Sequence, residues 1–275
     1  MSNTFPSPIV IWDLFGGSNH SVRKALGNIP NVEIYTFDIQ FNPEIPFDEK
    51  YMHNVSLIHY VEFASYVYVN NIPKPSFIFA SPCCKSFSSL LHVGKDLPDE
   101  RLGWKKVYEK DEYRYDVREV DEIGYYISKN KFFHHMKKEN VLLNAIIGKW
   151  LLSSTIEIIE NYKPIAWYIE NPQKSLMWEV IIKNHKDFWF SPHTYVFNNI
   201  AHYSSYNQDY SMKPTNFLSN LWLGLKADKT KSNATRKKGC RLPQSPGKYS
   251  KRSEIPKELI YDIFKKMCEK TINKV

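Results

Sequence analysis

The stretch PIVIWDLFGGSNHSVRKAL, residues 8–26, decides the fold predicted for this chain. Its unbroken apolar run predicts a buried strand that ends near Asp13. The two glycines that follow predict a tight turn, and a helix is expected from about Ser18 to Gly27. In a strand, glycine turn and helix of this kind, backbone N–H groups and the helix N-terminus face a bound ligand. The stretch therefore indicates an α/β fold with a ligand site at its first turn.

Strands and helices alternate along the rest of the chain. The second strand, VEIYTFDI, ends at Asp38, and further strands are predicted in PSFIFAS and IAWYIEN. This alternation predicts a mainly parallel sheet with helices on both faces. The predicted helices span 57–71, 139–162 and, after a Ser253 cap, 254 to about 270.

The composition is that of a globular protein with a large core. The 275 residues include 43% hydrophobic and 15% aromatic side chains, enough for one large domain or one domain with a small appendage. The most apolar helical stretch, NVLLNAIIGKWLLSS, is interrupted by Asn144 and Lys149 and is too short to cross a bilayer. Nothing near the first residues resembles a secretory signal. We therefore expect a soluble intracellular monomer that does not bind a membrane.

Positive charge is concentrated in one segment, residues 226–252. It holds ten basic residues against one acid, Asp228, in a chain whose net charge is +8. Its Gly, Pro and Ser content favours a loop. A charge run is commonly a solvated loop, but it also attracts a polyanion and releases counterions, as in nucleic-acid binding. The sequence leaves both interpretations open.

Two strand ends carry candidate carboxylates. Asp38 lies twenty-one residues beyond Gly17 and is placed to accept hydrogen bonds from ribose hydroxyls, which indicates a nucleoside cofactor. Glycine turns after strands are also common without a ligand, and the GxGxxG pattern is absent. Glu170, in YIENPQKSLMW, ends a buried strand, where a shielded carboxyl can keep or donate a proton. The alternative for this second element is a helix-capping turn.

The stretch ASPCCKSFSSL, residues 80–90, places two cysteines side by side after a proline. A disulfide between neighbours is not expected, because their side chains point apart. A thiolate nucleophile is one interpretation, since the charge of Lys85 and backbone N–H groups lower a thiol pKa. A buried small hydrophobic residue is the other. Metal binding with His92, His134 or His135 is disfavoured because there is no CxxC and no regular histidine spacing.

In this order, DLFGG, a strand-ending Asp, SPCCKSFS and IENP resemble the motifs of the C5-cytosine DNA methyltransferases. MKPTNFLSN, residues 212–220, looks like the Lys-Pro-Thr segment of the compact phage-borne branch, and KRSEIPKELIYDIF looks like its closing helix. The resemblance covers about residues 11–268. It implies a Rossmann-like S-adenosylmethionine-dependent methyltransferase fold and methyl transfer to C5 of a cytosine in double-stranded DNA.

The resemblance also assigns the catalytic residues. The family loop usually reads Ser-Pro-Pro-Cys, two residues, then Phe-Ser, so Phe87 and Ser88 set Cys84 on the nucleophile and Cys83 on the second proline. The thiolate of such enzymes adds to C6 of the cytosine and makes C5 nucleophilic. Glu170 would hold or protonate N3, and Asn171 would help to fix its loop. The cytosine must leave the base stack, because C6 is inaccessible within a duplex.

Three parts of the chain are expected: a catalytic domain at 1–210 with an insertion or lid at about 96–138, a short basic recognition segment at 211–252, and a closing helix at 253–275 that packs back on the catalytic domain.

The remaining implied residues fall into a cofactor group and a nucleic-acid group, with no metal ligand. The cofactor group is Asp13, Phe15, Gly16, Gly17, Asp38, Ile39 and Pro82. The nucleic-acid group is Lys85, Ser88, Lys213, Thr215, Arg236, Lys237, Lys238 and Arg252.

Four positions depart from the family pattern, namely Asn19, Ser56, Lys85 and Ser211. They keep two alternatives open: a weak or inactive homologue that binds DNA as a regulator, and an enzyme that acts on structured RNA. A nicotinamide oxidoreductase would explain the glycine turn but gives no role to Cys84 and Glu170. The active DNA methyltransferase is the hypothesis that uses every motif.

Overall fold

The apolar run at the start of the chain forms β1 (Ile9–Leu14), a strand whose six residues are all buried. It pairs in parallel with β2 (Val32–Asp38) on one side and with β4 (Phe77–Ala80) on the other. β1 is therefore a central strand, as its composition predicts. The computed structural model describes residues 8–17, 19–93, 97, 99–190, 195–228, 232–233 and 254–272.

Chain contacts divide the structure into two compact units. The first, here called the sheet unit, comprises Met1–Ser81, Ile158–Gln173 and Val196–Val275. The second, here called the hairpin unit, comprises Pro82–Glu157 and Lys174–Tyr195. The predicted functional boundaries at 210 and 252 stay predictions.

The sheet unit holds seven strands in the order β3-β2-β1-β4-β7-β9-β8. The further strands are β3 (Met52–Asn54), β7 (Ala166–Pro172), β8 (Phe197–His202) and β9 (Pro214–Ser219). Only β9 runs antiparallel to its neighbours β7 and β8. The sheet is thus mixed but mainly parallel, as expected. The chain order reverses direction across the sheet between β1 and β4.

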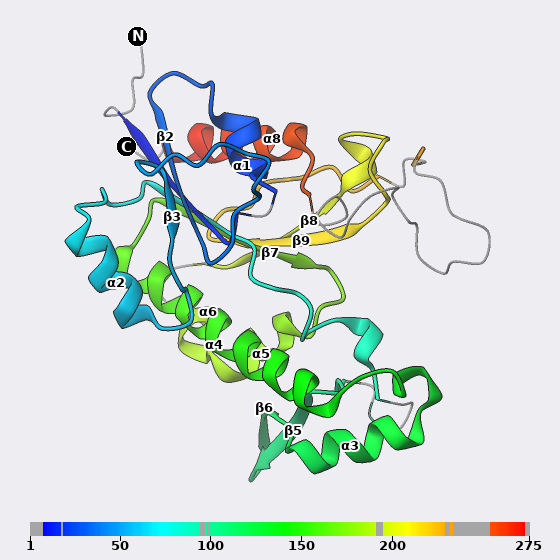
Figure 1. Cartoon of the computed structure of the whole chain (residues 1–275). Coiled ribbons are helices and arrows are strands. Elements are labelled where there is room, and N and C mark those ends of the chain that lie inside the picture. The colour runs from blue at the N-terminus through cyan, green and yellow to red at the C-terminus, as the bar shows by residue number, and fades with distance from the viewer. Residues whose placement is uncertain are drawn as a thin grey trace. The chain divides into compact units, whose positions relative to one another are not determined.

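Helices cover both faces of this sheet (Figure 1). On one face α1 (Ser21–Leu26) and α8 (Lys257–Ile272) pack together over an apolar core. On the other face Trp12 of β1 meets the ring of Phe63, in α2 (Tyr60–Val69), at 5.6 Å and that of Tyr162, at the end of α4 (Lys138–Tyr162), at 4.5 Å. Alternate residues of β1 therefore supply both cores.

The hairpin unit is built from an antiparallel hairpin and several helices. Leu102, Ile123, Phe133 and Val141 form one of its buried clusters. Its elements are the short helix η1 (Ser89–Leu91), β5 (Trp104–Glu109), β6 (Glu112–Val117), α3 (Val120–Lys129), the short helix η2 (Lys131–Phe133), most of α4, α5 (Met177–Asn184) and α6 (Lys186–Trp189).

The expected elements are present with two kinds of difference. α1 begins at Ser21 rather than near Ser18, because His20 before it has a left-handed backbone with φ 51°. The segment 96–138, predicted as an aperiodic insertion, contains the hairpin and α3. Strands β3, β8 and β9 and helix α5 were not predicted.

Among the described residues, α4 is the one helix long and apolar enough by length and composition to cross a membrane. It has 25 residues, more than the apolar stretch considered from sequence. Of its most apolar window, 44% is buried inside the structure.

Candidate functional site

A single row of residues crosses the sheet near its carboxyl edge. Leu14 pairs with both Phe37 and Ala80, and Ala80 pairs with Ile169. In open α/β sheets ligands bind at this edge, where the strand order reverses, which here is between β1 and β4. The next residues along these four strands are therefore level with one another: Asp38, Phe15, Ser81 and Glu170.

The glycine turn after β1 is tightly packed. Phe15 has φ 69°, and a Cβ on Gly16 would overlap the carboxylate of Asp13. A Cβ on Gly17 would lie 2.5 Å from the carbonyl oxygen of Gln40. The Gly17 N–H donates to Asp38 Oδ2 at 2.9 Å. The turn therefore requires glycine at both positions and links the ends of β1 and β2.

Asp13 is buried beneath this turn, with 4% of its surface exposed. Its Oδ2 has no hydrogen-bond partner among the described residues. Burial, and then the charge of Asp38, raise the pKa of Asp13 to about 7, and Arg23 partly opposes them. Burial thus favours the protonated form of Asp13 far more than in an exposed aspartate.

Asp38 and Ile39 form the outer part of this edge. Burial raises the pKa of Asp38, whose Oδ1 accepts the Gln40 N–H at 3.3 Å. Ile39 is 66% exposed although it is a large apolar residue. The carboxylate of Asp38 can accept hydrogen bonds from ribose hydroxyls, and the exposed side chain of Ile39 can contact the face of a base. Together they could bind a nucleoside.

Glu170 lies at the same edge, at the end of β7, with 7% exposure. Its Oε1 accepts the hydroxyl of Tyr203 at 3.2 Å and lies 3.5 Å from Nζ of Lys213. That ammonium also stands over the Tyr203 ring, 5.1 Å from its centroid. The carboxylate of Glu170 is thus oriented by two groups from outside its own strand.

Asn171 and Thr215 are fully buried in the sheet, each with 0% exposure. Thr215 pairs with Pro172 across β7 and β9, and its hydroxyl donates to the carbonyl of Lys213 at 3.4 Å. Thr215 was expected to contact nucleic acid, but its burial gives it a supporting position instead. Lys213 is the member of this predicted pair that reaches the carboxyl edge.

The cysteine loop belongs to the hairpin unit. Cys83 is exposed and Cys84 is half-buried, and neither is in a disulfide. The Phe87 N–H donates to the Cys84 carbonyl at 3.2 Å, which closes a turn. Phe87 is fully buried and stacks on Trp104 at 5.0 Å. Its carbonyl accepts the N–H of Leu176 at 3.0 Å.

The same loop rests closely on α4. A Cβ on Gly148 would overlap Oγ of Ser86 and lie 3.3 Å from the Phe87 ring. Ser88 caps η1 by accepting the Leu90 N–H at 3.2 Å. Pro82 is buried, whereas Lys85 is exposed. The loop is therefore anchored after Cys84 and solvent-facing at Cys83 and Lys85.

The predicted site residues divide between the units. Cys84 belongs to the hairpin unit and Glu170 to the sheet unit, so the described geometry does not join them into one site. Arg236, Lys237, Lys238 and Arg252 lie outside the described residues. Tyr203 was not predicted, because no local pattern marks a tyrosine thirty-three residues beyond its partner Glu170.

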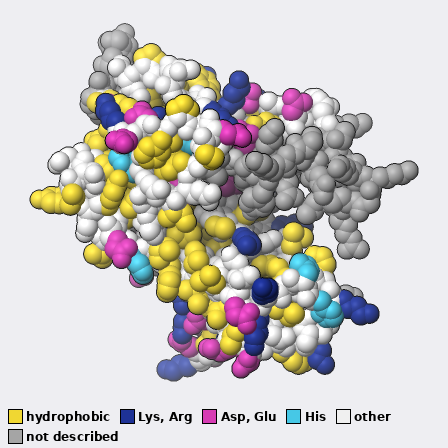
Figure 2. Space-filling model, in the orientation of Figure 1, with side chains coloured by type: hydrophobic (Ala, Val, Ile, Leu, Met, Phe, Trp, Pro, Cys, Tyr) yellow, Lys and Arg dark blue, Asp and Glu magenta, His cyan; other side chains and the backbone are white. Residues whose placement is uncertain are grey.

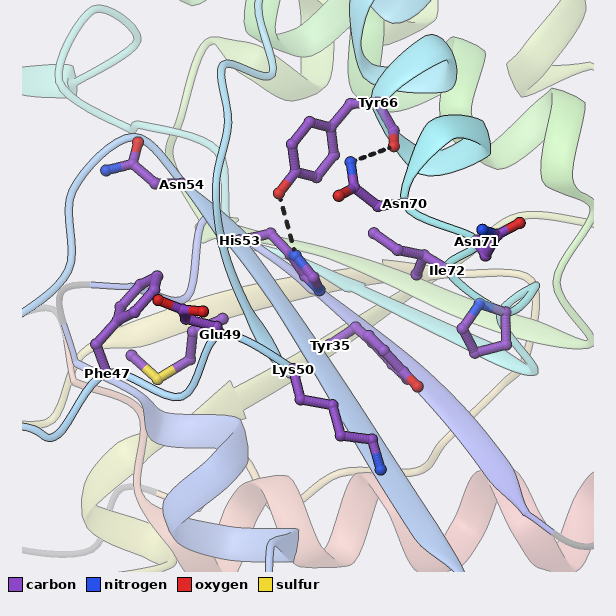
Figure 3. A pocket seen from close by; sticks show the side chains of 12 residues that line it. Tyr35, Phe47, Glu49, Lys50, His53, Asn54, Tyr66, Asn70, Asn71 and Ile72 are labelled. Carbon is purple, nitrogen blue, oxygen red and sulfur yellow. Dashed lines mark hydrogen bonds between the residues drawn. The ribbon is translucent and has the colours of Figure 1, made fainter.

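A hollow of about 620 Å³ opens beside β3 and α2, and it contains none of the predicted residues (Figure 3). Tyr35, His53 and Tyr66 supply its aromatic wall. Nδ1 of His53 lies 3.2 Å from the Tyr66 hydroxyl, and burial lowers the pKa of this histidine. No sequence motif indicated this hollow.

Comparison with known proteins identifies no close relative. No protein-family model matches the chain, and no curated protein matches it. A solved structure described as the Entamoeba histolytica methyltransferase EhMeth is similar over 82% of this chain, with 12% sequence identity and a TM-score of 0.43. The similarity covers 58% of that chain's length. It is too distant to assign an activity.

Proposed function

We propose that this chain is an S-adenosylmethionine-dependent DNA methyltransferase that acts on C5 of cytosine. The observation that carries the proposal is the buried Glu170. Strand register puts it in the same row as the glycine turn and Asp38, and Tyr203 and Lys213 orient its carboxylate. The row therefore contains both residues suited to bind a nucleoside and an oriented carboxylate. A dehydrogenase would have no use for that carboxylate.

The glycine turn and the residues that follow β2 support a single nucleoside cofactor rather than a dinucleotide. Asp38 and the exposed Ile39 would bind the ribose and base of S-adenosylmethionine, and the compact turn at Gly16 and Gly17 would bring backbone N–H groups close. The dinucleotide fold has an all-parallel order, 3-2-1-4-5-6, whereas β9 is reversed here. When bound, S-adenosylmethionine supplies an electrophilic methyl group.

The proposed chemistry begins with Cys84. Its thiolate forms a bond from Sγ to C6 of the cytosine, and the C5–C6 double-bond electrons shift so that N3 becomes basic. N3 takes a proton from a donor that Glu170 holds or supplies. C5 then bonds to the methyl carbon, whose former bond to sulfur breaks. Loss of the C5 proton to water expels the thiolate, and the N3 proton returns to the group that donated it, which restores the neutral aromatic ring.

The contacts of Glu170 support a role in this step. Both of its contacts with described residues are made to Oε1, from Tyr203 and Lys213. Oε2 is thus the oxygen offered to a base edge. A buried, preorganised group of this kind stabilises charge more than the same group in water. Cys84 enters the proposal through the sequence resemblance and through its half-buried, anchored loop.

Double-stranded DNA is the proposed substrate. The cytosine must leave the stack before Sγ can reach C6, which costs a few kcal/mol that contacts with the protein must offset. Lys213 stands beside Glu170 at the carboxyl edge, where a phosphate or base can meet it. The basic segment 226–252 adds charge for phosphate contacts.

The test is a duplex pool that carries 5-fluorocytosine. Fluorine cannot leave C5 as a proton does, so the enzyme should remain bonded to the base. We expect an adduct that requires S-adenosylmethionine and maps to Cys84 by peptide mass spectrometry. Cys84→Ser should abolish it, and Glu170→Gln should slow its formation by a hundredfold or more, about the effect of removing one oriented donor.

Cys83→Ala is the matched control, because it removes the neighbouring thiol and should leave the adduct intact. An adduct at Cys83 would reassign the nucleophile. Wild-type protein that binds DNA and cofactor yet traps no fluorinated site would favour the regulatory homologue. Adducts on fluorinated RNA alone would change the substrate.

A further inference from the structure

One surface of the hairpin unit combines cations with exposed aromatic rings. It is formed by the end of α3, by η2 and by the turn into α4. Figure 2 shows histidine, lysine and apolar side chains side by side on this part of the molecule. We name it the α3–η2 surface, and its exposed members are Tyr125, Lys129, Lys131, Phe132, His134, His135 and Lys137.

The positive charge of this surface is not neutralised locally. Residues 125–138 contain four lysines and no acidic residue. Lys138 pairs with Asp121 at 3.4 Å. Lys129, Lys131 and Lys137 form no ion pair with any acid among the described residues. Three ammonium groups are thus left to attract an anionic partner.

Two aromatic rings of this surface are exposed and do not contribute to the core. Phe133 is 1% exposed and fills the cluster around Leu102, whereas its neighbour Phe132 is 59% exposed. Tyr125 is 57% exposed, and Nζ of Lys129 lies 5.6 Å from its ring centroid. Single exposed rings are ordinary, but this segment combines two of them with three lysines that have no acidic partner among the described residues, and such side chains stack on bases and contact phosphates.

The backbone of the surface is held in place. The side-chain oxygen of Asn130 accepts the Phe132 N–H at 3.0 Å, and the backbone carbonyl of Asn130 accepts the Phe133 N–H at 2.8 Å. At the other end of α3, Glu119 and Glu122 form a capping box. Binding therefore orders side chains rather than the main chain, which keeps its entropic cost low.

We propose that the α3–η2 surface binds a nucleic-acid strand with unstacked bases, its lysines contacting phosphates and its rings stacking on bases. The choice of nucleic acid as partner rests on the proposed function, but the surface lies in a segment that none of the resembling motifs covers. Lysines alone would suit any polyanion. The exposed rings favour a strand whose bases have left the stack, which base extrusion produces.

Fluorescence anisotropy of the full-length chain with labelled single-stranded and duplex oligonucleotides, over a series of salt concentrations and without cofactor, tests this surface. Lys129→Gln with Lys131→Gln and Lys137→Gln should reduce the salt slope for the single strand by about two, close to 0.7 per lost contact. Tyr125→Ser with Phe132→Ser should weaken single-strand binding about tenfold or more at an unchanged slope. Duplex affinity should then hardly change.

The matched control replaces three exposed lysines of the sheet unit, Lys74, Lys163 and Lys265, with glutamine. Its salt slope should equal that of the wild type. A lysine variant that behaves like this control overturns the proposal, and so does an aromatic variant that keeps full single-strand affinity. If the lysine variant shows the expected reduction in salt slope but the wild-type chain traps no fluorocytosine, only the methyltransferase assignment would be contradicted. Trapping with unchanged slopes would contradict only the surface.

Discussion

The sheet unit and the hairpin unit are stabilised by different interactions. In the sheet unit, strand register places Asp38 and Glu170 level with the glycine turn. In the hairpin unit, charged contacts dominate: eight of the twelve ion pairs between described residues lie there. Register depends on the backbone and tolerates side-chain changes, whereas an ion pair depends on both partners. The two units should therefore fail in different ways.

The largest effect is expected from the buried ion pair of the hairpin unit. The guanidinium of Arg118 meets the carboxylate of Glu100, with 4% and 10% of their side chains exposed. Arg118→Ala leaves a buried charge without its partner and should lower the free energy of unfolding by about 3–5 kcal/mol. Hydrogen exchange should show the loss in β5, β6 and α3, with β1 and β2 protected.

Arg114→Ala is the control for this change. Arg114 also pairs with two acids, Glu109 and Asp116, but 45% of its side chain is exposed. Its removal should cost at most about 1 kcal/mol. Equal losses for both variants, or a loss spread over β1 and β2, would show that the units do not differ as argued.

Asp13 should give the sheet unit a pH dependence of opposite sign to that of an ordinary carboxylate. Its pKa is about 7 in the fold against an ordinary 3.8, so its contribution is complete below about 3.8 and is lost as pH rises through about 7. The loss is on the order of 4 kcal/mol. Urea unfolding at several pH values should show a flatter profile for Asp13→Asn, and parallel profiles would assign the titration to another group.

A smaller effect on stability than that of Arg118 or Asp13 is expected at Tyr203. Tyr203→Phe keeps the ring and removes the hydroxyl that donates to Glu170. It should cost about 1 kcal/mol of stability but slow adduct formation roughly tenfold, because the carboxylate loses one of its two orienting contacts. Single-turnover trapping measures this rate at saturating DNA.

Tyr206→Phe is the matched variant for that measurement. Its hydroxyl also donates to a carboxylate, Asp262, at 2.9 Å in the same unit. It should lose similar stability at an unchanged trapping rate. If both variants slowed trapping equally, Tyr203 would have a general structural role rather than one directed at Glu170.

The sheet unit shows how much of this arrangement the sequence can predict. β1, β2, β4 and β7 were predicted because buried parallel strands appear as unbroken apolar runs. Their ends then bring Asp38 and Glu170 to one edge. β3 was missed because it has three residues, and β9 because its sequence, PTNFLS, contains no unbroken apolar run.

The hairpin unit was not predicted for a different physical reason. β5 carries charges on both faces and so lacks the alternation that marks a half-buried strand, whereas β6 does alternate charged residues with Tyr113, Tyr115 and Val117, a signal that the sequence analysis missed. Their pairing is supported instead by contacts such as the ammonium groups of Lys106 and Lys183, 4.4 and 4.6 Å from the Tyr113 ring centroid. The contact of Lys183 joins residues far apart in the chain, so no local pattern indicates it.

The place of β9 in the sheet has a consequence for biosynthesis. β7, the strand of Glu170, pairs with β4 on one side and with β9 on the other, and β9 is made last of the three. While the ribosome translates residues 173–213, the outer edge of β7 therefore exposes N–H and C=O groups that another nascent chain could pair with. A transcript that stops before β9 would yield an open sheet edge, so slow translation through this interval should favour aggregation over folding.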